Sequence, residues 1–89
     1  MITVHKYPVS YSGLFYIELP EGAEFLTVQI QNGKPQMWFR VDDTHYVRAQ
    51  YFGIVGTGLD MDKKIEHAPY LGTVQEGSFV WHLFGGLYA

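Results

Sequence analysis

Residues 24–43, EFLTVQIQNGKPQMWFRVDD, contain the strongest folding signal of the chain. Apolar residues alternate with polar ones on both sides of a turn: Leu26, Val28 and Ile30 before it, and Met37, Phe39 and Val41 after it. This period of two is typical of a strand that is buried on one face. Asn32 and Gly33 favour a two-residue type I′ turn, because both tolerate a positive φ. The stretch therefore predicts an antiparallel hairpin with one apolar and one polar face.

Short strand signals recur on both sides of this hairpin, whereas helical periodicity is nearly absent. We expect further strands at residues 2–9, 11–20, 47–55, 71–75 and 78–84. Pro8 places the first of them at a sheet edge, because proline lacks an amide donor for the ladder. Closely spaced short strands predict an all-β fold. We expect one domain, residues 1–89, folded as a small antiparallel sandwich or partly open barrel of six to seven strands.

Two segments are expected to lie outside the sheets. Residues 56–70, GTGLDMDKKIEHAPY, form a long charged connection with at most one short helical turn, around residues 61–66. Such a loop is the part of a small domain in which mobility is most expected. The tail at residues 85–89, GGLYA, carries Leu87 and Tyr88 after two flexible glycines.

The composition of the chain excludes several classes of partner. A chain of 89 residues buries only about 60–65% of its unfolded surface. Because 47% of its residues are hydrophobic and 17% aromatic, we expect self-association into a homo-oligomer. A net charge of −3 provides no basic face for duplex nucleic acid. The chain has no apolar run long enough to span a membrane as a helix and no signal-peptide core, so we expect no membrane partner.

Neither a metal site nor a catalytic set is expected. The Cys count is 0, and the spacing of the four histidines is not one that metals use: His5, His45, His67 and His82. We expect His82 to be a buried, hydrogen-bonded residue. The acidic and hydroxyl residues form no acid–base or nucleophile signature. We therefore expect a protein that is not an enzyme and that binds no cofactor.

Three glycines crowd the segment GIVGTG, which runs from Gly53 to Gly58. They match neither the dinucleotide fingerprint nor a P-loop, because no helix start is visible and no Lys-Ser/Thr pair follows. Two interpretations remain open. In the first, the amides of Gly56, Thr57 and Gly58 form an anion-binding nest beside the threonine hydroxyl. In the second, the segment is a bulge at Gly53 followed by the end of a strand.

The polar face of the central hairpin offers groups that suit a nucleotide. Trp38 presents a plane for stacking a base, Arg40 a bidentate fork for phosphate, and Gln29 an amide that reads a base edge. Arg48 is a second candidate for phosphate and Gln75 for a base edge. The same face also suits an oligomer interface or a solvated surface, because Trp and Arg are favoured interface residues.

The chain resembles a group of small bacteriophage and prophage proteins. The pattern runs through four stretches and covers almost the whole chain: HKYPV (5–9), LPEGAEFLTVQIQNGKPQMWFRVD (19–42), FGIVGTG (52–58) and YLGTVQEGSFVWHLF (70–84). The group has no assigned catalytic residues. The resemblance implies a phage accessory protein that acts in the cytoplasm of its bacterial host.

By analogy with phage proteins that blunt host defence, we expect a non-catalytic sponge. Such a protein sequesters a small phosphorylated, nucleotide-derived immune signal and needs a pocket but no catalytic group. The alternative is a protein–protein inhibitor or a minor virion or assembly factor, whose interface anchors would be Trp38, Tyr51, Leu87 and Tyr88. A hydrolase acting on a small nucleotide is a third hypothesis, and it requires His67 or His82 beside an acid.

Overall fold

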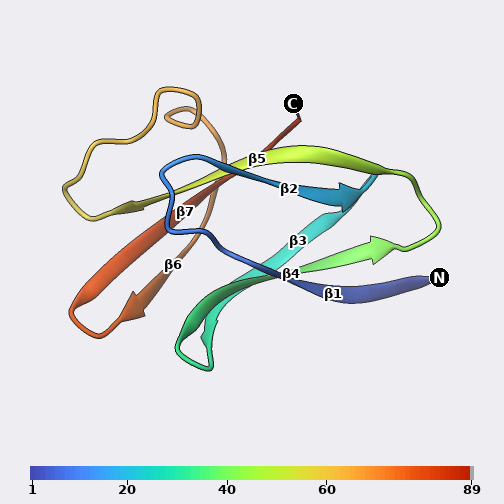
Figure 1. Ribbon diagram of the computed structural model, residues 1–89, viewed down its shortest axis with the longest axis horizontal. Helices are drawn as coiled ribbons and strands as arrows, with labels where there is room; N and C mark the ends of the chain where they lie inside the picture. The colour runs from blue at the N-terminus through green and yellow to red at the C-terminus, as the bar shows by residue number, and fades with distance from the viewer. Residues whose placement is uncertain (89) are drawn as a thin grey trace.

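The computed structural model describes residues 1–88, which form strands joined by turns and loops (Figure 1). The seven strands are β1 (Ile2–Pro8), β2 (Phe15–Pro20), β3 (Glu24–Gln31), β4 (Lys34–Asp42), β5 (Val47–Gly56), β6 (Tyr70–Glu76) and β7 (Phe79–Tyr88). Each strand region expected from the sequence is present. The described residues contain no helix long and apolar enough to cross a membrane.

The strands form two antiparallel sheets that pack as an open sandwich. The strand order is β1-β4-β3 in the three-stranded sheet and β2-β5-β7-β6 in the four-stranded sheet. The sheets meet through β3 and β6, and through β2 and β4, without closing into a barrel. This arrangement confirms the all-β fold and places β1, the strand that contains Pro8, at a sheet edge.

The β3–β4 hairpin has the turn that the sequence predicts and a bulge that it does not predict. Asn32 has a φ of 52° and Gly33 a φ of 77°, the left-handed pair of a type I′ turn. The register of the two strands shifts just after Phe25. The Phe25 ring packs 5.5 Å from the ring of Phe39, whereas Leu26 is 40% exposed. The expectation that Leu26 lies on the buried face is therefore wrong.

One apolar core joins the two sheets. Its buried side chains are Val9, Leu19, Val28, Met37, Phe39, Val41, Phe52, Ile54, Val74 and Leu83. The Phe39 ring makes edge-to-face contacts with Tyr7 of β1 and with Phe52 of the other sheet, at centroid distances of 5.7 and 6.0 Å. Burial of a phenylalanine side chain contributes about 1.5–3 kcal/mol. These rings therefore hold the two sheets together.

The C-terminal residues continue β7, although the sequence suggests a flexible tail. Leu87 pairs with Tyr51 and Gly85 pairs with Phe52, so that Gly86 is bulged out between the two pairs. Gly85 has a φ of 148°, and a Cβ atom at this position would lie 2.6 Å from Phe52 Cα. Gly85 thus allows the close approach of β7 to β5, and Gly86 forms the bulge between the two pairs. Ala89 lies outside the described residues.

Ile65 holds the long β5–β6 connection against the four-stranded sheet. Its side chain is fully buried. Together with the carbonyl of Gly13, it occupies the space that a Cβ atom of Gly53 would need. Gly53 pairs regularly with Phe84, so the bulge proposed at Gly53 is wrong. The missing side chain of Gly53 instead allows Ile65 to pack closely against β5. The connection itself forms turns rather than a helix.

Candidate binding site

The residues expected to form a nucleotide pocket are divided between the two sheets. Trp38 and Arg40 belong to β4 and Gln29 belongs to β3. All three are on the outer face of the three-stranded sheet, because the residues that alternate with them are buried in the core or packed against it. In the register of this sheet, Arg40 is opposite Glu24.

The other candidates are on the four-stranded sheet. Arg48 is near the start of β5 and Gly56 is its last residue, so that roughly 26 Å of extended strand separates them. Thr57 and Gly58 follow Gly56, and Gln75 belongs to β6. A ligand of nucleotide size does not reach from Arg48 to Thr57. The structure therefore does not bring the predicted residues together.

Both predicted phosphate-binding arginines are engaged by carboxylates. Arg40 Nη1 lies 3.2 Å from Glu24 Oε2, and Arg48 Nη1 lies 3.3 Å from Glu21 Oε2. The Arg48 guanidinium also stacks on the ring of Tyr88, with its Cζ atom 3.7 Å from the ring centroid. Solvent-exposed ion pairs contribute only about 0–1 kcal/mol to stability. They nevertheless place negative charge where a phosphate would have to bind.

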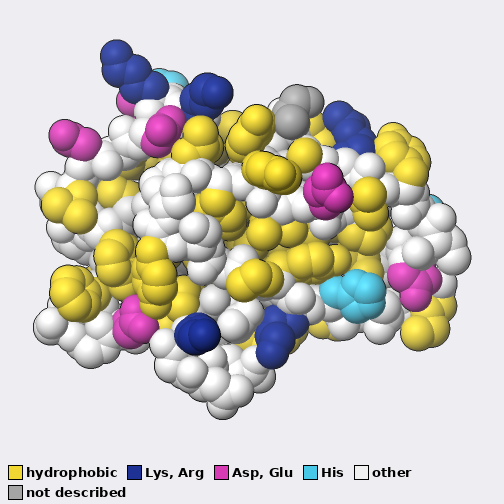
Figure 2. Space-filling model, in the orientation of Figure 1, with side chains coloured by type: hydrophobic (Ala, Val, Ile, Leu, Met, Phe, Trp, Pro, Cys, Tyr) yellow, Lys and Arg dark blue, Asp and Glu magenta, His cyan; other side chains and the backbone are white. Residues whose placement is uncertain are grey.

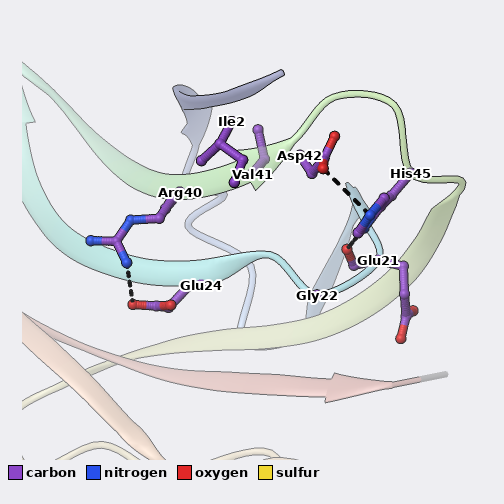
Figure 3. Close-up of a pocket in the computed structure, with 8 residues that line it drawn as sticks. All are labelled: Ile2, Glu21, Gly22, Glu24, Arg40, Val41, Asp42 and His45. Atoms are coloured by element: carbon purple, nitrogen blue, oxygen red, sulfur yellow. Dashed lines mark hydrogen bonds and ion pairs between the residues drawn. The ribbon is translucent and has the colours of Figure 1, made fainter.

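A small pocket of about 200 Å³ lies beside Arg40 (Figure 3). It is lined by Ile2, Glu21, Gly22, Glu24, Arg40, Val41, Asp42 and His45. In Figure 3 the Arg40 guanidinium is directed at Glu24 and the His45 ring at Asp42. Carboxylates outnumber the guanidinium here, so the pocket is unfavourable for an anion.

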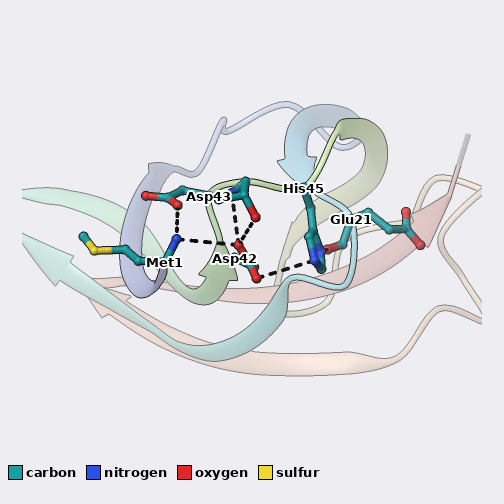
Figure 4. A network of polar contacts seen from close by, with 6 residues as sticks. Met1, Glu21, Asp42, Asp43 and His45 are labelled. Atoms are coloured by element: carbon teal, nitrogen blue, oxygen red, sulfur yellow. Dashed lines mark hydrogen bonds and ion pairs between the residues drawn. The ribbon is translucent and has the colours of Figure 1, made fainter.

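A polar network next to this pocket fastens the start of β1 to the loop after β4 (Figure 4). The Met1 ammonium lies 2.5 Å from Asp43 Oδ1 and 3.7 Å from Asp42 Oδ1. Asp42 Oδ1 accepts hydrogen bonds from the Thr44 hydroxyl at 2.6 Å and from the Thr44 amide at 3.0 Å. These bonds lower the pKa of the Asp42 carboxyl, and Asp43 raises the pKa of the Met1 amino group. The network has a structural role at the edge of the sheet.

The glycine-rich segment ends in a turn. Leu59 N–H donates to Gly56 O at 3.0 Å, and Gly58 has a φ of 82°, as in a type II turn. Thr57 N–H donates to Val80 O at 3.2 Å. Of the three amides assigned to the nest, that of Thr57 is therefore hydrogen-bonded within the chain. The geometry agrees with one part of the second interpretation, the end of a strand, whereas the bulge at Gly53 is not formed.

His82 is the centre of a hydrogen-bond chain on the outer face of the four-stranded sheet. Its Nε2 lies 2.7 Å from Thr57 Oγ1 and its Nδ1 lies 2.9 Å from Thr73 Oγ1. Thr73 Oγ1 lies 2.5 Å from the Tyr70 hydroxyl. These partners tie both ends of the β5–β6 connection to β7. No carboxylate is among them within residues 1–88, and this part of the chain contains no group of three side chains arranged for a metal ion.

A wide cleft, which the sequence does not predict, lies beside the β6–β7 hairpin. Its volume is about 640 Å³, and it is lined by Tyr11, Glu76, Gly77, Ser78, Phe79 and Trp81. An adjoining hollow of about 330 Å³ is lined by Gly56, Thr57, Leu59, Ser78, Phe79, Val80 and Trp81. We call the two together the aromatic cleft. Figure 2 shows hydrophobic side chains gathered at the lower left, the end of the molecule where Figure 1 places this hairpin.

Three aromatic rings form the aromatic cleft. Phe79 stacks on Trp81 with a centroid distance of 5.8 Å and an interplanar angle of 19°. Tyr11 approaches the same indole at 5.4 Å and 57°. Phe79 is 63% and Tyr11 48% exposed, whereas Trp81 is half-buried and packs against the core. Trp81 thus anchors two exposed rings to the rigid interior.

The aromatic cleft contains few polar groups. The Tyr11 hydroxyl donates to Glu76 Oε1 at 2.6 Å, and this bond raises the pKa of Tyr11. Trp81 Nε1 is buried and has no hydrogen-bond partner among the described residues. Of the residues that line the cleft, Glu76 alone carries a charge. The site is therefore an apolar surface with one carboxylate at its wall.

The sequence contains part of the signal for the aromatic cleft. Phe79 and Trp81 are two positions apart in an expected strand, so they had to share a face. Tyr11 reaches them through the connection between β1 and β2, and its partner Glu76 is 65 positions away. Such a contact depends on strand order, which local patterns do not determine.

Comparisons with known proteins assign the chain to a family without assigning it a function. A family model described as "Domain of unknown function (DUF7352)" matches residues 1–87. Neither the curated proteins nor the solved structures include a match to the chain. Because the family model covers nearly the whole chain, the protein belongs to the DUF7352 family.

Proposed function

We propose that the protein is a non-catalytic interaction module that holds a segment of another protein in the aromatic cleft. Trp and Tyr are among the residues that most often dominate the free energy of binding at protein interfaces. Tyr11, Phe79 and Trp81 lie together on one surface, and Phe79 is 63% exposed. This cluster of exposed rings on a rigid support is the observation that carries the proposal.

The shape of the aromatic cleft favours a chain segment. Its larger part has a volume of about 640 Å³, which falls in the range of about 300–1,000 Å³ for ligand pockets. Small-molecule pockets bury most of their ligand, however, whereas Phe79 and Tyr11 keep 63% and 48% of their surface in solvent. A partner segment would desolvate these rings in the manner of an interface hot spot.

The charges around the aromatic cleft disfavour a phosphorylated ligand. Its one charged lining residue is the acidic Glu76, which repels an anion. Arg40 and Arg48 are on other parts of the molecule, where they pair with Glu24 and Glu21. A phosphate would therefore have to displace existing ion pairs or bind beside a carboxylate.

The nucleotide sponge is the second candidate function. One observation favours it, namely the nearly parallel stack of Phe79 on Trp81. A base stacks on such a ring with a gain of about 1–3 kcal/mol. In this candidate the aromatic cleft supplies the stacking plane that the sequence assigns to Trp38, and the phosphates point to solvent.

The setting of the proposal follows from the resemblance to bacteriophage and prophage proteins. In the leading candidate the bound segment belongs to a host protein that the module inhibits, or to a virion component that it helps to assemble. Both roles take place in the cytoplasm of the bacterial host. Neither requires catalysis or a cofactor.

Selection from a displayed library of random peptides tests the proposed function. Peptides selected on the wild-type protein are then measured against Phe79→Ala and Tyr16→Ala. Tyr16 is a matched control, because it is an exposed aromatic residue on another strand, β2, with 59% of its surface in solvent. We expect Phe79→Ala to weaken binding about ten-fold or more and Tyr16→Ala to leave it unchanged.

The same variants separate the two candidates. Cyclic nucleotides and ADP-ribose derivatives are added to the wild-type protein, and the melting temperature is recorded. A ligand that binds the folded state raises this temperature. A rise in the wild type that is lost in Phe79→Ala supports the nucleotide sponge. Selected peptides that bind both alanine variants as tightly as the wild type contradict the assignment of the aromatic cleft.

A further inference from the structure

We infer that the aromatic cleft binds an arginine side chain of the partner segment. The inference rests on the proposed function and specifies the chemistry of the partner. Three observations support it: the aromatic faces of the cleft, the carboxylate that lies among them, and an arginine elsewhere in the chain that is held by an aromatic ring and a glutamate.

The aromatic cleft combines ring faces with an acceptor for a cation. The Phe79–Trp81 stack offers a planar surface, and Tyr11 is tilted beside it at 5.4 Å from the indole. Glu76 Oε1 accepts one bond, from the Tyr11 hydroxyl. A carboxylate has about four acceptor sites, so Glu76 retains the capacity to accept a guanidinium fork. The negative faces of these rings also attract a cation electrostatically.

Arg48 shows how this chain already holds a guanidinium group. Its Cζ atom lies 3.7 Å from the centroid of the Tyr88 ring, and its Nη1 lies 3.3 Å from Glu21 Oε2. One aromatic face and one glutamate are thus sufficient to position it. The aromatic cleft presents the same two kinds of group, three rings and Glu76, and none of its lining residues is basic.

Arginine fits this site better than lysine or a neutral side chain. The guanidinium is planar, stacks on aromatic rings and presents two parallel N–H groups to a carboxylate, whereas the ammonium of lysine is compact and strongly hydrated. The net charge of −3 also favours the approach of a basic segment. Glu76 is therefore the residue that selects for charge, and Phe79 the residue that selects for planarity.

Nuclear magnetic resonance of the Trp81 indole N–H tests the inference. The chain has two tryptophans, so a Trp38→Phe background leaves the Trp81 signal alone. The probes are blocked tripeptides Gly-Arg-Gly, Gly-Lys-Gly and Gly-citrulline-Gly, of which the last has the shape of arginine without its charge. We expect the arginine peptide to shift the signal to saturation with a Kd on the order of 1–10 mM. The lysine peptide should bind at least three-fold and the citrulline peptide at least ten-fold more weakly.

Variants of the carboxylate identify the group responsible. Glu76→Gln keeps an acceptor for the Tyr11 hydroxyl and removes the charge. We expect this variant to bind the arginine peptide at least five-fold more weakly than the wild type. Glu18→Gln changes an exposed glutamate on β2 and should have no effect. Equal binding of the arginine and citrulline peptides, unchanged affinity in Glu76→Gln, or no shift of the Trp81 signal would each overturn the inference.

The outcomes distinguish failure of the inference from failure of the proposed function. Library peptides that need Phe79 but carry no arginine, and that bind Glu76→Gln normally, would leave the interaction module in place and remove the arginine site. Binding of the arginine tripeptide without any Phe79-dependent library peptide would keep the arginine site and contradict the protein-segment function.

Discussion

The Tyr11 hydroxyl donates a 2.6 Å hydrogen bond to Glu76 Oε1. The contact joins the connection between β1 and β2 to the end of β6, across 65 positions of sequence. It forms one side of the aromatic cleft and fixes both the tyrosine ring and the carboxylate that we assign to partner recognition. The same bond raises the pKa of Tyr11, which makes the contact measurable.

The ionisation of Tyr11 reports whether this contact forms in solution. Because the folded-state pKa is raised, the bond stabilises the protein fully below the ordinary tyrosine value of 10.0. This contribution is lost as the pH rises through the folded-state pKa. We expect Glu76→Gln to lower the pKa of Tyr11. An absorbance titration of tyrosinate measures this pKa, and the Tyr11→Phe variant identifies which titration step belongs to Tyr11. An unchanged pKa of Tyr11 in Glu76→Gln would contradict the contact.

Gly53 and Ile65 are expected to behave as a coupled pair. A Cβ atom at Gly53 would meet the buried Ile65 side chain and the carbonyl of Gly13, so Gly53→Ala should cost about 2–3 kcal/mol by overpacking. Ile65→Ala should cost about 2–4 kcal/mol by leaving a cavity. In the double variant the clash with Ile65 is relieved. Denaturant unfolding should therefore show a smaller loss of stability in the double variant than the sum of the losses in the two single variants. Strict additivity would contradict the docking of the β5–β6 connection.

The two glycines of the C-terminal bulge are expected to differ in their tolerance of alanine. A Cβ atom at Gly85 would lie 2.6 Å from Phe52 Cα, whereas one at Gly86 would have nothing within 4 Å. Both have a positive φ, which costs about 1–2 kcal/mol for alanine. Gly85→Ala should therefore lower the free energy of unfolding by about 3 kcal/mol or more, and Gly86→Ala by about half as much. Equal effects would mean that the tail does not pair with β5.

Asp42 is expected to contribute to stability only above acidic pH. Its pKa is lowered from the ordinary value of 3.8, mainly by the hydrogen bonds from Thr44. A carboxyl group with a depressed folded-state pKa stabilises the protein above the unfolded value, and this contribution is lost as the pH falls through the folded-state pKa. Asp42→Asn should therefore flatten the acid limb of a stability–pH curve. Asp60→Asn is the control, since no hydrogen bond to its side chain is present in residues 1–88, and an equal flattening there would contradict this role for Asp42.

Much of the fold is predictable because its signals are local. The alternation in β3 and β4, the Asn32–Gly33 turn and the edge position of Pro8 each depend on residues close together in sequence. The burial predicted for Leu26 is wrong because a bulge inserts one residue into a strand and reverses the face of its neighbours. Pairing with β5 also converts the apparent tail into strand, a tertiary effect that local propensity does not include.

The candidate site was harder to predict because it depends on strand order. Trp38 and Arg48 are both predicted to bind the same ligand, yet their strands, β4 and β5, belong to different sheets. Conversely, Tyr11 lies beside Phe79 and Trp81 only because the connection between β1 and β2 passes next to β7. Self-association, expected from composition, stays a prediction that sedimentation velocity tests.

We propose that Phe79 and its neighbouring rings hold a segment of a partner protein. Calorimetric titration of one library-selected peptide into the wild type, Phe79→Ala and Tyr16→Ala tests this binding. We expect at least ten-fold weaker binding, about 1.4 kcal/mol, in Phe79→Ala and wild-type affinity in Tyr16→Ala. Wild-type affinity in Phe79→Ala, or equal losses in both variants, would contradict it.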